Sequence, residues 1–346
     1  MEAVLQKFGI PSDALIIPIT SGIINKTWKV CSVKGNYILQ QINDHVFVNP
    51  ELIHGNITAI ASYLKKNYSS YLFPAPILHS AGSQLLKEPG VGYFRVFPFI
   101  EGTHTIDVVA NPKQAFEAAE QFGRFTAYLG GFNCNQLNVT IPDFHNLSYR
   151  YQQFQEALKS GNAERIHNEK SLIDKLTRLQ FLVKQYDAIT KNNSFKKRVT
   201  HHDTKISNVL FNEQDNAVCI IDLDTVMPGY FISDVGDMMR TYLCEVSENE
   251  EDISKIKIRP DYYYAIVEGY YKEMQNELTN EEKKHFFFAG QFMIYMQALR
   301  FLTDYLNNDI YYQIQYPTHN LVRAINQVVL LERLMEYETE FKKMKL

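Results

Sequence analysis

Apolar and polar positions in the first hundred residues follow a pattern that predicts several short strands and one helix. Apolar runs lie on either side of residues 34–36, whose glycine and asparagine tolerate the positive φ of a hairpin turn. A helix is expected after Asn49, which can act as its N-cap, and its apolar residues recur at helical spacing as far as Leu64. Two more strands are expected around residues 84–87 and 93–97. The predicted order is strands, helix, strands.

Beyond residue 101 the pattern changes to long amphipathic helices. One begins at Pro112 and ends before the glycine pair at 130–131, and charged helical stretches are expected at 149–159 and 163–191. Short strands return between residues 200 and 225, with a turn at 213–216. Helices then continue to the end of the chain. One of them is predicted to begin at a capping box, because Thr279 is followed three residues later by Glu282.

A late helix at residues 292–306 is apolar around almost its whole circumference, which predicts that it is buried. Gln297, Arg300 and Asp304 nevertheless fall on one of its faces, at i, i+3 and i+7. A buried polar stripe needs partners. Two interpretations stay open: the partners belong to the protein, or the stripe binds the hydroxyl groups of an acceptor such as a sugar.

These elements together predict the fold class and the domain organisation. We expect an α+β, bilobal, protein-kinase-like fold with a small strand-rich N-terminal lobe at residues 1–100 and a large, mainly helical C-terminal lobe at 101–346. The N-terminal lobe would bind a nucleotide, and the C-terminal lobe would carry the catalytic and acceptor-binding residues. A hinge is expected at residues 97–102.

Composition narrows the class of partner. A chain of 346 residues that is 45% hydrophobic and 21% charged is typical of a soluble globular protein with about two domains. A net charge of −4 without a polybasic segment argues against nucleic acid and an anionic membrane as partners. No apolar run is long enough to span a membrane, and the N-terminus does not resemble a signal peptide, so a cytoplasmic location is expected.

The four cysteines Cys31, Cys134, Cys219 and Cys244 lie far apart and lack metal-ligand or disulfide spacing, so they are interpreted as plain thiols. No GxxxxGK[ST] phosphate loop is present in the sequence, which argues against the other large class of nucleotide-binding proteins.

The segment HHDTKISNVLF at 201–211, followed by IDLDT at 221–225, carries the most specific chemistry. Asp203, Asn208 and Asp222 stand in the order in which kinases place a catalytic aspartate and two magnesium ligands. Asp203 would orient or deprotonate an acceptor hydroxyl, while Asn208 and Asp222 would hold Mg²⁺. The sequence therefore predicts transfer of a phosphoryl group.

Neighbouring residues indicate the type of acceptor. His201 occupies the place of a histidine that supports the catalytic loop, and His202 stands where protein kinases carry an arginine for an activation-loop phosphate. Only a short stretch separates Asp222 from Asp234, which leaves little room for a peptide-docking loop. A small-molecule acceptor is therefore favoured over a protein.

Three further aspartates surround the motif. Asp234 and Asp237 are expected to cap a helix and to brace the catalytic loop. Asp224 would point the same way as Asp222 along a strand, and it is a candidate for an outer or second metal ligand.

The nucleotide contacts are expected in the N-terminal lobe. Residues 20–28 occupy the position of a phosphate-covering loop but contain one glycine, so Ile24, Asn25 and Thr27 are the expected contacts there. The strand position that should offer a phosphate-pairing lysine carries Gln40. In the hinge, Phe97 or Phe99 would pack on adenine.

HxDTKxxNVLF, IDLDTVMPG and DVGDMMR resemble the aminoglycoside phosphotransferase/choline kinase superfamily. Within it, SGIINKTW, YILQQIN and ALRFLTDYL are most similar to N-acetylhexosamine 1-kinases, and the resemblance runs from about Thr20 to Glu332. It implies ATP and Mg²⁺ as cofactors and phosphorylation of the anomeric hydroxyl of GlcNAc or GalNAc. Gln40 in place of lysine is a variant that these sugar kinases share.

By the same resemblance, Asp203 would be the base and Arg300 a sugar contact. The full set of expected acceptor contacts is His202, Lys205, Asp224, Arg300 and Asp304, and Asn208 is also expected near the nucleotide. The protein is expected to act on a small-molecule sugar as a monomer or weak homodimer.

Two alternatives remain. A kinase for choline, an aminoglycoside or another amino alcohol would need an acidic or aromatic site for a cation, and an acidic run at residues 245–252 follows the catalytic segment. A catalytically silent ATP or sugar sensor is suggested by Gln40 and the glycine-poor loop.

Overall fold

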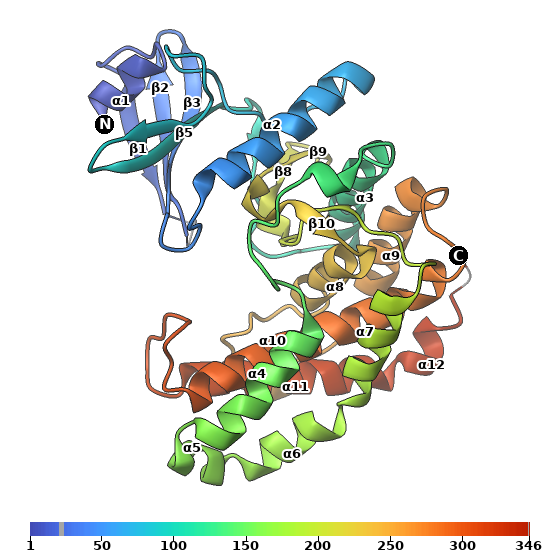
Figure 1. Cartoon of the computed structure of the whole chain (residues 1–346). Helices are drawn as coiled ribbons and strands as arrows, with labels where there is room; N and C mark the ends of the chain where they lie inside the picture. Colours follow the sequence, from blue (N-terminus) through green and yellow to red (C-terminus); the bar gives the residue numbers. More distant parts are fainter. Residues whose placement is uncertain (21–23, 345) are drawn as a thin grey trace. The chain divides into compact units, whose positions relative to one another are not determined.

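The structure, a computed structural model, describes residues 1–20, 24–344 and 346 (Figure 1). It divides into two compact units, each built from segments that are far apart in the sequence. The first unit contains residues 1–104, 131–142 and 210–228, and the second contains 105–130, 143–209 and 229–346. The sequence pattern divides the chain into two continuous lobes, with the boundary between residues 100 and 101, and that division stays a prediction.

The first unit is organised around a five-stranded antiparallel sheet with the strand order β1-β2-β3-β5-β4 (Figure 1). Its elements are α1 (Glu2–Lys7), β1 (Leu15–Ile19), β2 (Lys26–Ser32), β3 (Gly35–Ile42), β4 (Leu86–Glu88) and β5 (Gly92–Pro98). Ser32 pairs with Gly35, whose φ is 127°, so the predicted hairpin is confirmed, but its turn consists of Val33 and Lys34, and Gly35 already belongs to β3. The two later strands are confirmed as well.

The two faces of this sheet differ in chemistry. On one face Val30, Leu39 and Val96 are fully buried and form a core with α1. On the other face Thr27, Gln40 and Arg95 form a row across three strands, because Thr27 pairs with Gln40 and Gln40 pairs with Arg95. Side chains of directly paired residues point to the same face. The strand register therefore brings these three polar side chains together on one face of the sheet.

A long helix and a small second sheet complete the first unit. Its other elements are α2 (Pro50–Asn67), β6 (Thr103–His104), η1 (Cys134–Gln136), β8 (Val209–Asn212), β9 (Ala217–Ile220), η3 (Leu223–Thr225) and β10 (Met227–Gly229). β6, β8 and β9 form a three-stranded sheet. Asn49 takes the N-cap position of α2, but its side chain forms no capping hydrogen bond. Buried Asn56 holds α2 in place by donating to the carbonyls of Asn138 and Val226, at 2.9 and 3.0 Å.

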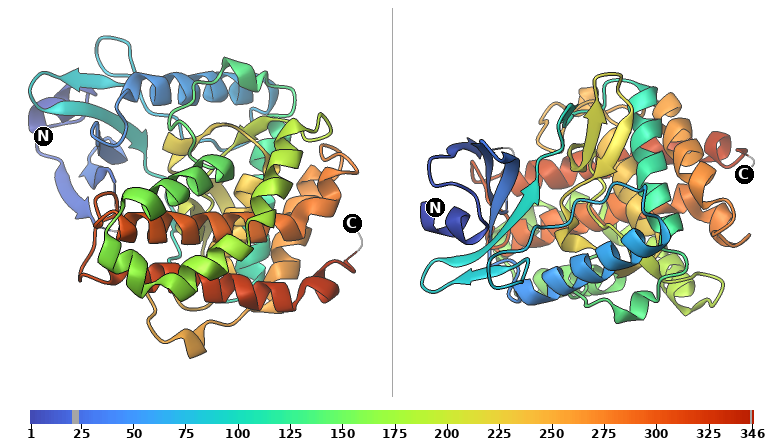
Figure 2. Two further views of the ribbon diagram at one scale, coloured as in Figure 1. Left: turned by 60° about the horizontal axis from the view of Figure 1, so that its bottom comes forward. Right: turned by 90° about the horizontal axis from the view of Figure 1, so that it is seen from above.

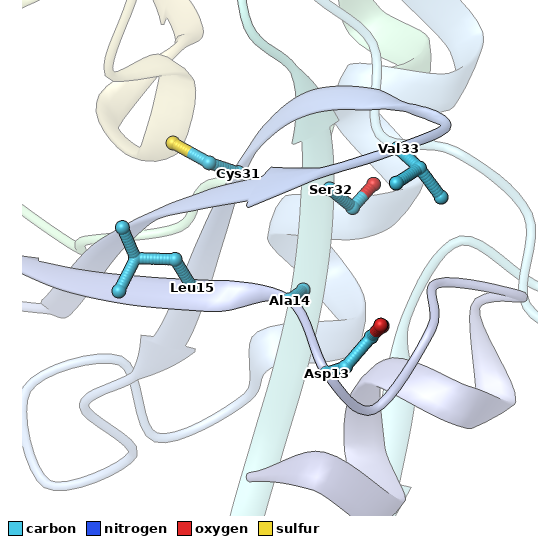
Figure 3. A pocket seen from close by; sticks show the side chains of 6 residues that line it. All are labelled: Asp13, Ala14, Leu15, Cys31, Ser32 and Val33. Atoms are coloured by element: carbon cyan, nitrogen blue, oxygen red, sulfur yellow. The ribbon is translucent and has the colours of Figure 1, made fainter.

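One open hollow of the first unit lies where β1 begins and β2 ends (Figure 3). It is lined by Asp13, Ala14, Leu15, Cys31, Ser32 and Val33. None of the residues expected to bind substrate or nucleotide lies in it.

The second unit is almost entirely helical. Its elements are α3 (Pro112–Tyr128), α4 (Leu147–Ser160), α5 (Ala163–Asn168), α6 (Lys170–Arg178), α7 (Phe181–Lys191), β7 (Arg198–Thr200), η2 (Ile206–Asn208), α8 (Phe231–Tyr242), η4 (Ile253–Lys255), α9 (Pro260–Met274), η5 (Glu282–His285), α10 (Phe286–Leu306), α11 (His319–Glu336) and α12 (Glu338–Phe341). The stretch expected at 163–191 is broken into α5, α6 and α7, and α6 and α7 each bury their own apolar residues.

α10 is the buried centre of the second unit, as its apolar pattern predicts. It packs against α8 and α11, and the red and orange helices run side by side in both views of Figure 2. The approach of α8 is close because Gly236 has no side chain: a Cβ there would lie 2.3 Å from the carbonyl oxygen of Ala289. None of the described helices is both long and apolar enough to cross a bilayer.

The predicted capping box ahead of α10 is confirmed. The backbone N–H of Thr279 donates to Glu282 at 2.8 Å, and the N–H of Glu282 donates to the Thr279 hydroxyl at 3.1 Å. Both orphan N–H groups are thereby paired.

Candidate active site

The loop at residues 201–208 is held in shape by carboxylates on α8. Asp234 is fully buried and accepts hydrogen bonds from the backbone N–H groups of His201 and His202, at 3.0 and 2.8 Å. Asp237 accepts from the N–H of Thr204 at 2.8 Å. The predicted bracing role of both aspartates is confirmed. The predicted helix cap is wrong, because the N-cap residue of α8 is Tyr230.

Burial raises the pKa of both carboxylates. It raises the pKa of Asp234 to about 7, although the two backbone hydrogen bonds oppose the shift. Burial also raises the pKa of Asp237, against the opposing effect of Arg240. Arg240 contacts Asp237 at 3.1 Å and Glu248 at 2.8 Å. These groups are occupied by structural contacts and set the conformation of the loop.

Asp203, the predicted base, lies at the centre of this loop with its carboxylate partly exposed. Oδ2 accepts from the amide nitrogen of Asn208 and contacts the ammonium of Lys205, each at 3.0 Å. Burial by itself raises the pKa of Asp203, but Lys205, His201 and Asn208 outweigh it, so the pKa lies below its ordinary value. Asp203 is therefore ionised at neutral pH, as an acceptor of a proton must be.

Asn208 is oriented so that it can bind a cation. Its Nδ2 donates both to the carboxylate of Asp203 and to the Asp203 carbonyl, at 3.0 and 2.9 Å. Its oxygen Oδ1 forms no hydrogen bond with any described residue. An amide oxygen is a ligand that Mg²⁺ accepts. Oδ1 of Asn208 is therefore suited to act as a ligand of a magnesium ion.

His202 adopts a strained backbone conformation, and its ring contacts other residues of the second unit. Its φ is 66°, which is uncommon for a residue other than glycine. The ring nitrogens lie 2.7 Å from the hydroxyl of Thr200 and 3.3 Å from Nδ1 of His145. A Cβ at Gly229 would lie 2.6 Å from the ring, so glycine is needed there. The structure thus gives His202 protein partners through both nitrogens.

His145 is the centre of an arginine-rich cluster in the second unit. Burial lowers the pKa of His145 well below its ordinary value, and His202, Arg300, Arg240 and Arg150 lower it further. Burial also lowers the pKa of Arg150, followed by the charge of Arg300. His145 is therefore neutral at pH 7, and the cluster has a positive potential.

Arg300 on α10 lies against three aromatic rings. Its guanidinium carbon is 5.7 Å from the ring centre of Phe144, 5.5 Å from that of Tyr312 and 5.9 Å from that of Tyr311. Such distances are typical of cation–π contacts. Gln297 joins this cluster, because it accepts from Arg300 at 3.1 Å and donates to the Tyr312 hydroxyl at 3.3 Å.

Asp304, the third member of the polar stripe, is satisfied from within the protein. It accepts from the backbone N–H groups of Tyr311 and Tyr312, at 2.8 and 2.9 Å, and from the side chain of Asn320 at 2.9 Å. The stripe therefore has partners of the protein's own, as one of the two interpretations required. Asp304 fixes the loop that presents both tyrosines.

In the first unit, the polar row on the sheet connects three of the residues expected to contact a nucleotide. Gln40 donates to Thr27 at 3.3 Å and accepts from Nε of Arg95 at 3.0 Å. Arg95 contacts Asp224 at 2.6 Å, and Asn25 donates to the other oxygen of Asp224 at 2.7 Å. Asn25, Thr27, Gln40 and Asp224 thus belong to one network centred on Arg95.

The remaining expected residues of the first unit lie around this network. Phe97 shares the face of the row, and its ring lies 5.1 Å from the Arg95 guanidinium. Phe99 lies under the ammonium of Lys29, at 3.9 Å. Ile24 is exposed, and residues 21–23 of the expected phosphate loop lie outside the described residues.

Asp222, the second predicted magnesium ligand, precedes η3 and is exposed. Its φ of 61° is left-handed. Such a strained conformation is common at functional sites.

Sequence reasoning missed several residues of these clusters. Arg95 belongs to none of the motifs, yet a charged residue in the middle of a buried strand is itself a signal. Phe144, His145, Tyr311 and Tyr312 have no local motif, and only the tertiary structure brings them to Arg300.

A model of the phosphotransferase enzyme family matches residues 16–259 of the chain. Among solved structures, a microcompartment-associated aminopropanol kinase is similar over 99% of this chain and 97% of its own, with 16% identity and a TM-score of 0.66. Spectinomycin phosphotransferase, solved with ADP and spectinomycin, shares 14% identity over 97% of both chains, with a TM-score of 0.59. An ethanolamine kinase of Plasmodium vivax shares 14% identity over 94% of this chain and 86% of its own, with a TM-score of 0.59.

At these identities the solved structures show the fold alone, and they agree with the predicted kinase-like arrangement of a strand-rich N-terminal sheet and a mainly helical C-terminal part. The family match covers well over half of the chain and includes the loop of Asp203 and Asn208 as well as Asp222. The chain therefore belongs to the phosphotransferase enzyme family and is a small-molecule kinase of that family.

Proposed function

We propose that the protein transfers the γ-phosphoryl group of ATP to the anomeric hydroxyl of an N-acetylhexosamine and releases the sugar 1-phosphate and ADP. The acceptor oxygen attacks the γ-phosphorus while the bond from that phosphorus to the bridging oxygen of ADP breaks. The proton of the hydroxyl passes to Asp203, whose lowered pKa keeps it ionised, and then to solvent.

The observation that carries the choice of acceptor is the placement of Arg300 over Phe144, Tyr311 and Tyr312. A kinase that binds choline or another ammonium compound would use such rings to hold the cation of its substrate. Here the protein's own guanidinium takes that place. Arg150 adds to the positive potential of Arg300 around His145, which disfavours a cationic acceptor further.

A neutral polyol with an amide suits this cluster better than a cation does. Arg300, Gln297 and the Tyr312 hydroxyl offer donors and acceptors for hydroxyl and acetamido groups, beside aromatic rings on which a sugar can pack. The specific N-acetylhexosamine rests on the sequence resemblance of SGIINKTW, YILQQIN and ALRFLTDYL.

The acidic run that motivated the cationic alternative has other partners. Glu248 pairs with Arg240 and Glu250 with Lys255, at 2.8 and 3.2 Å. Asp252 accepts from the N–H of Ser254 at 3.0 Å, as the cap of η4. These contacts support the interpretation of the run as a local surface feature.

ATP as donor is proposed because the related spectinomycin phosphotransferase was solved with ADP. Asn208 and Asp222 would hold Mg²⁺, which neutralises charge on the phosphate oxygens when it is bound. The free Oδ1 of Asn208 supports its part of this assignment.

The test is a panel of acceptors. With ATP and Mg²⁺, we expect ADP release with GlcNAc or GalNAc and none above background with choline, ethanolamine or kanamycin, and ³¹P NMR should show a sugar 1-phosphate. Turnover of a cationic acceptor instead would overturn the choice of substrate. ATP binding without turnover of any acceptor would favour the sensor interpretation.

Lys205 is expected to control the pH dependence of this reaction. Its ammonium lowers the pKa of Asp203, so its removal should raise that pKa. In Lys205→Met the acid limb of the kcat/KM profile should therefore move to higher pH, because the base becomes protonated earlier as the pH falls. Because the pKa of Asp203 lies below its ordinary value, the profile is measured by ADP release from about pH 3 to 8, so that the acid limb falls within the measured range.

Lys205→Arg is the matched control, because it keeps the positive charge and should keep an acid limb near that of the wild type. An unchanged limb in Lys205→Met would exclude Asp203 as the titrating base or Lys205 as its partner.

A further inference from the structure

Arg95 is a buried arginine of the first unit, and the described residues do not pair all of its nitrogen atoms. The side chain of Arg95 is 4% exposed, and Arg95 is the only arginine in the sequence of this unit. A buried charge is expensive unless it is paired and hydrogen-bonded. The partners of Arg95 therefore indicate what it does.

Two of its nitrogens have partners and the third has none. Nε donates to Gln40, and Nη2 lies 2.6 Å from Oδ1 of Asp224. The latter contact is close but not aligned as a hydrogen bond, so charge attraction holds the pair. Nη1 is buried and forms no hydrogen bond with any described residue. Buried donors of this kind are rare, and each needs an explanation, such as a functional role or a bound water or ion.

The register places this donor where a phosphate-binding cation is missing. Gln40 stands at the strand position of the expected lysine, and Arg95 is its direct partner on β5. The two side chains therefore share one face and one level of the sheet. Phe97 shares that face, and Asn25 is linked to the row through Asp224. A positive charge is thus present at the expected level, but it comes from the neighbouring strand.

We infer that Arg95 is the phosphate-binding cation of the nucleotide site, with Nη1 free to donate to a phosphate oxygen and Asp224 as the carboxylate that orients it. The inference rests on the proposed use of ATP. It also accounts for Gln40: a lysine there would place a second cation against Arg95, whereas glutamine accepts from its Nε. Arginine suits the task because its planar fork holds several donors in a fixed geometry.

The experiment measures nucleotide binding and not turnover. Isothermal titration calorimetry of the full chain gives Kd values for MgADP and for adenosine. Loss of a charge-assisted contact to phosphate should weaken ADP binding by Arg95→Gln about 10- to 100-fold. Adenosine, which has no phosphate, should bind within about twofold of the wild type.

A relocated charge provides the decisive control. In the double variant Gln40→Lys/Arg95→Gln the cation moves one strand across on the same face, and ADP affinity should be largely restored. Lys66→Gln removes one positive charge from the exposed surface of α2 in the same unit and should leave ADP binding unchanged.

Three results would overturn the inference. One is a folded Arg95→Gln that binds ADP as tightly as the wild type. Another is an equal loss of ADP and adenosine with a lowered Tm, which would show a purely structural ion pair. The third is a folded double variant whose ADP affinity is not recovered. If Arg95→Gln does not fold, the double variant by itself tests the inference. Wild-type protein that binds no ADP would instead contradict the proposed function itself.

Discussion

Asp203→Asn is expected to lower kcat with the preferred acceptor by about 10²- to 10⁴-fold, the range that a positioned general base contributes. The asparagine keeps the shape of the side chain, and its oxygen can still accept from Nδ2 of Asn208, which lies 3.0 Å from Asp203 Oδ2 in the wild type. It cannot take a proton from the acceptor hydroxyl, and it loses the charge that attracts Lys205. The measurement is single-turnover phosphoryl transfer at saturating ATP and acceptor.

Two controls separate chemistry from folding in this experiment. Asp174→Asn removes the same charge from the exposed surface of α6 and should keep kcat within about twofold of the wild type. ADP should bind to Asp203→Asn nearly as it binds to the wild type. Full activity of a folded Asp203→Asn would remove Asp203 from the mechanism and leave positioning and metal chemistry to account for the rate.

Glu282→Gln is expected to lower the free energy of unfolding by about 3–5 kcal/mol, the cost of breaking a buried ion pair from one side. Glu282 is fully buried and receives the guanidinium of Arg198 through both oxygens, at 2.6 and 2.9 Å. It also accepts from the backbone N–H groups of Lys196 and Thr279. All of these partners are donors, so the amide nitrogen of glutamine would face another donor and Arg198 would lose its counter-charge.

Urea unfolding followed by far-UV circular dichroism measures this loss. The matched control is Glu332→Gln, which breaks the exposed pair between Glu332 and Lys175 and should cost less than about 1 kcal/mol. Similar losses in the two variants would show that the buried pair has no special role. The double variant Arg198→Met/Glu282→Met should recover much of the stability, because no unpaired charge remains in the interior.

The local elements of the chain were predictable because their signals lie within a few residues of one another. The hairpin before Gly35, the helix that begins at Pro112 and the capping box of Thr279 and Glu282 all follow from backbone preferences at neighbouring positions. The order of Asp203, Asn208 and Asp222 likewise indicated phosphoryl transfer, because the loop and the two strands after it are continuous in the sequence. Binary patterning also predicted the burial of α10.

Contacts between distant segments were not predictable in this way. Asp304 was expected to bind an acceptor, but the structure occupies it with the backbone of Tyr311 and Tyr312 and with Asn320. Which partner a buried polar group finds depends on how the chain returns to it, and periodicity contains no information about that.

By itself the sequence determined the kinase-like order of strands and helices and the presence of glutamine, and not lysine, at position 40, and it predicted the catalytic aspartate and its neighbours. Only the tertiary structure decided that Arg95 stands beside Gln40, because strand register pairs residues that are 55 positions apart. Only the tertiary structure placed Arg300 over three aromatic rings from two other segments. The physical reason is the same in both cases: chain connectivity fixes short-range geometry, whereas the charge and shape of a binding surface are set by side chains that meet only after folding.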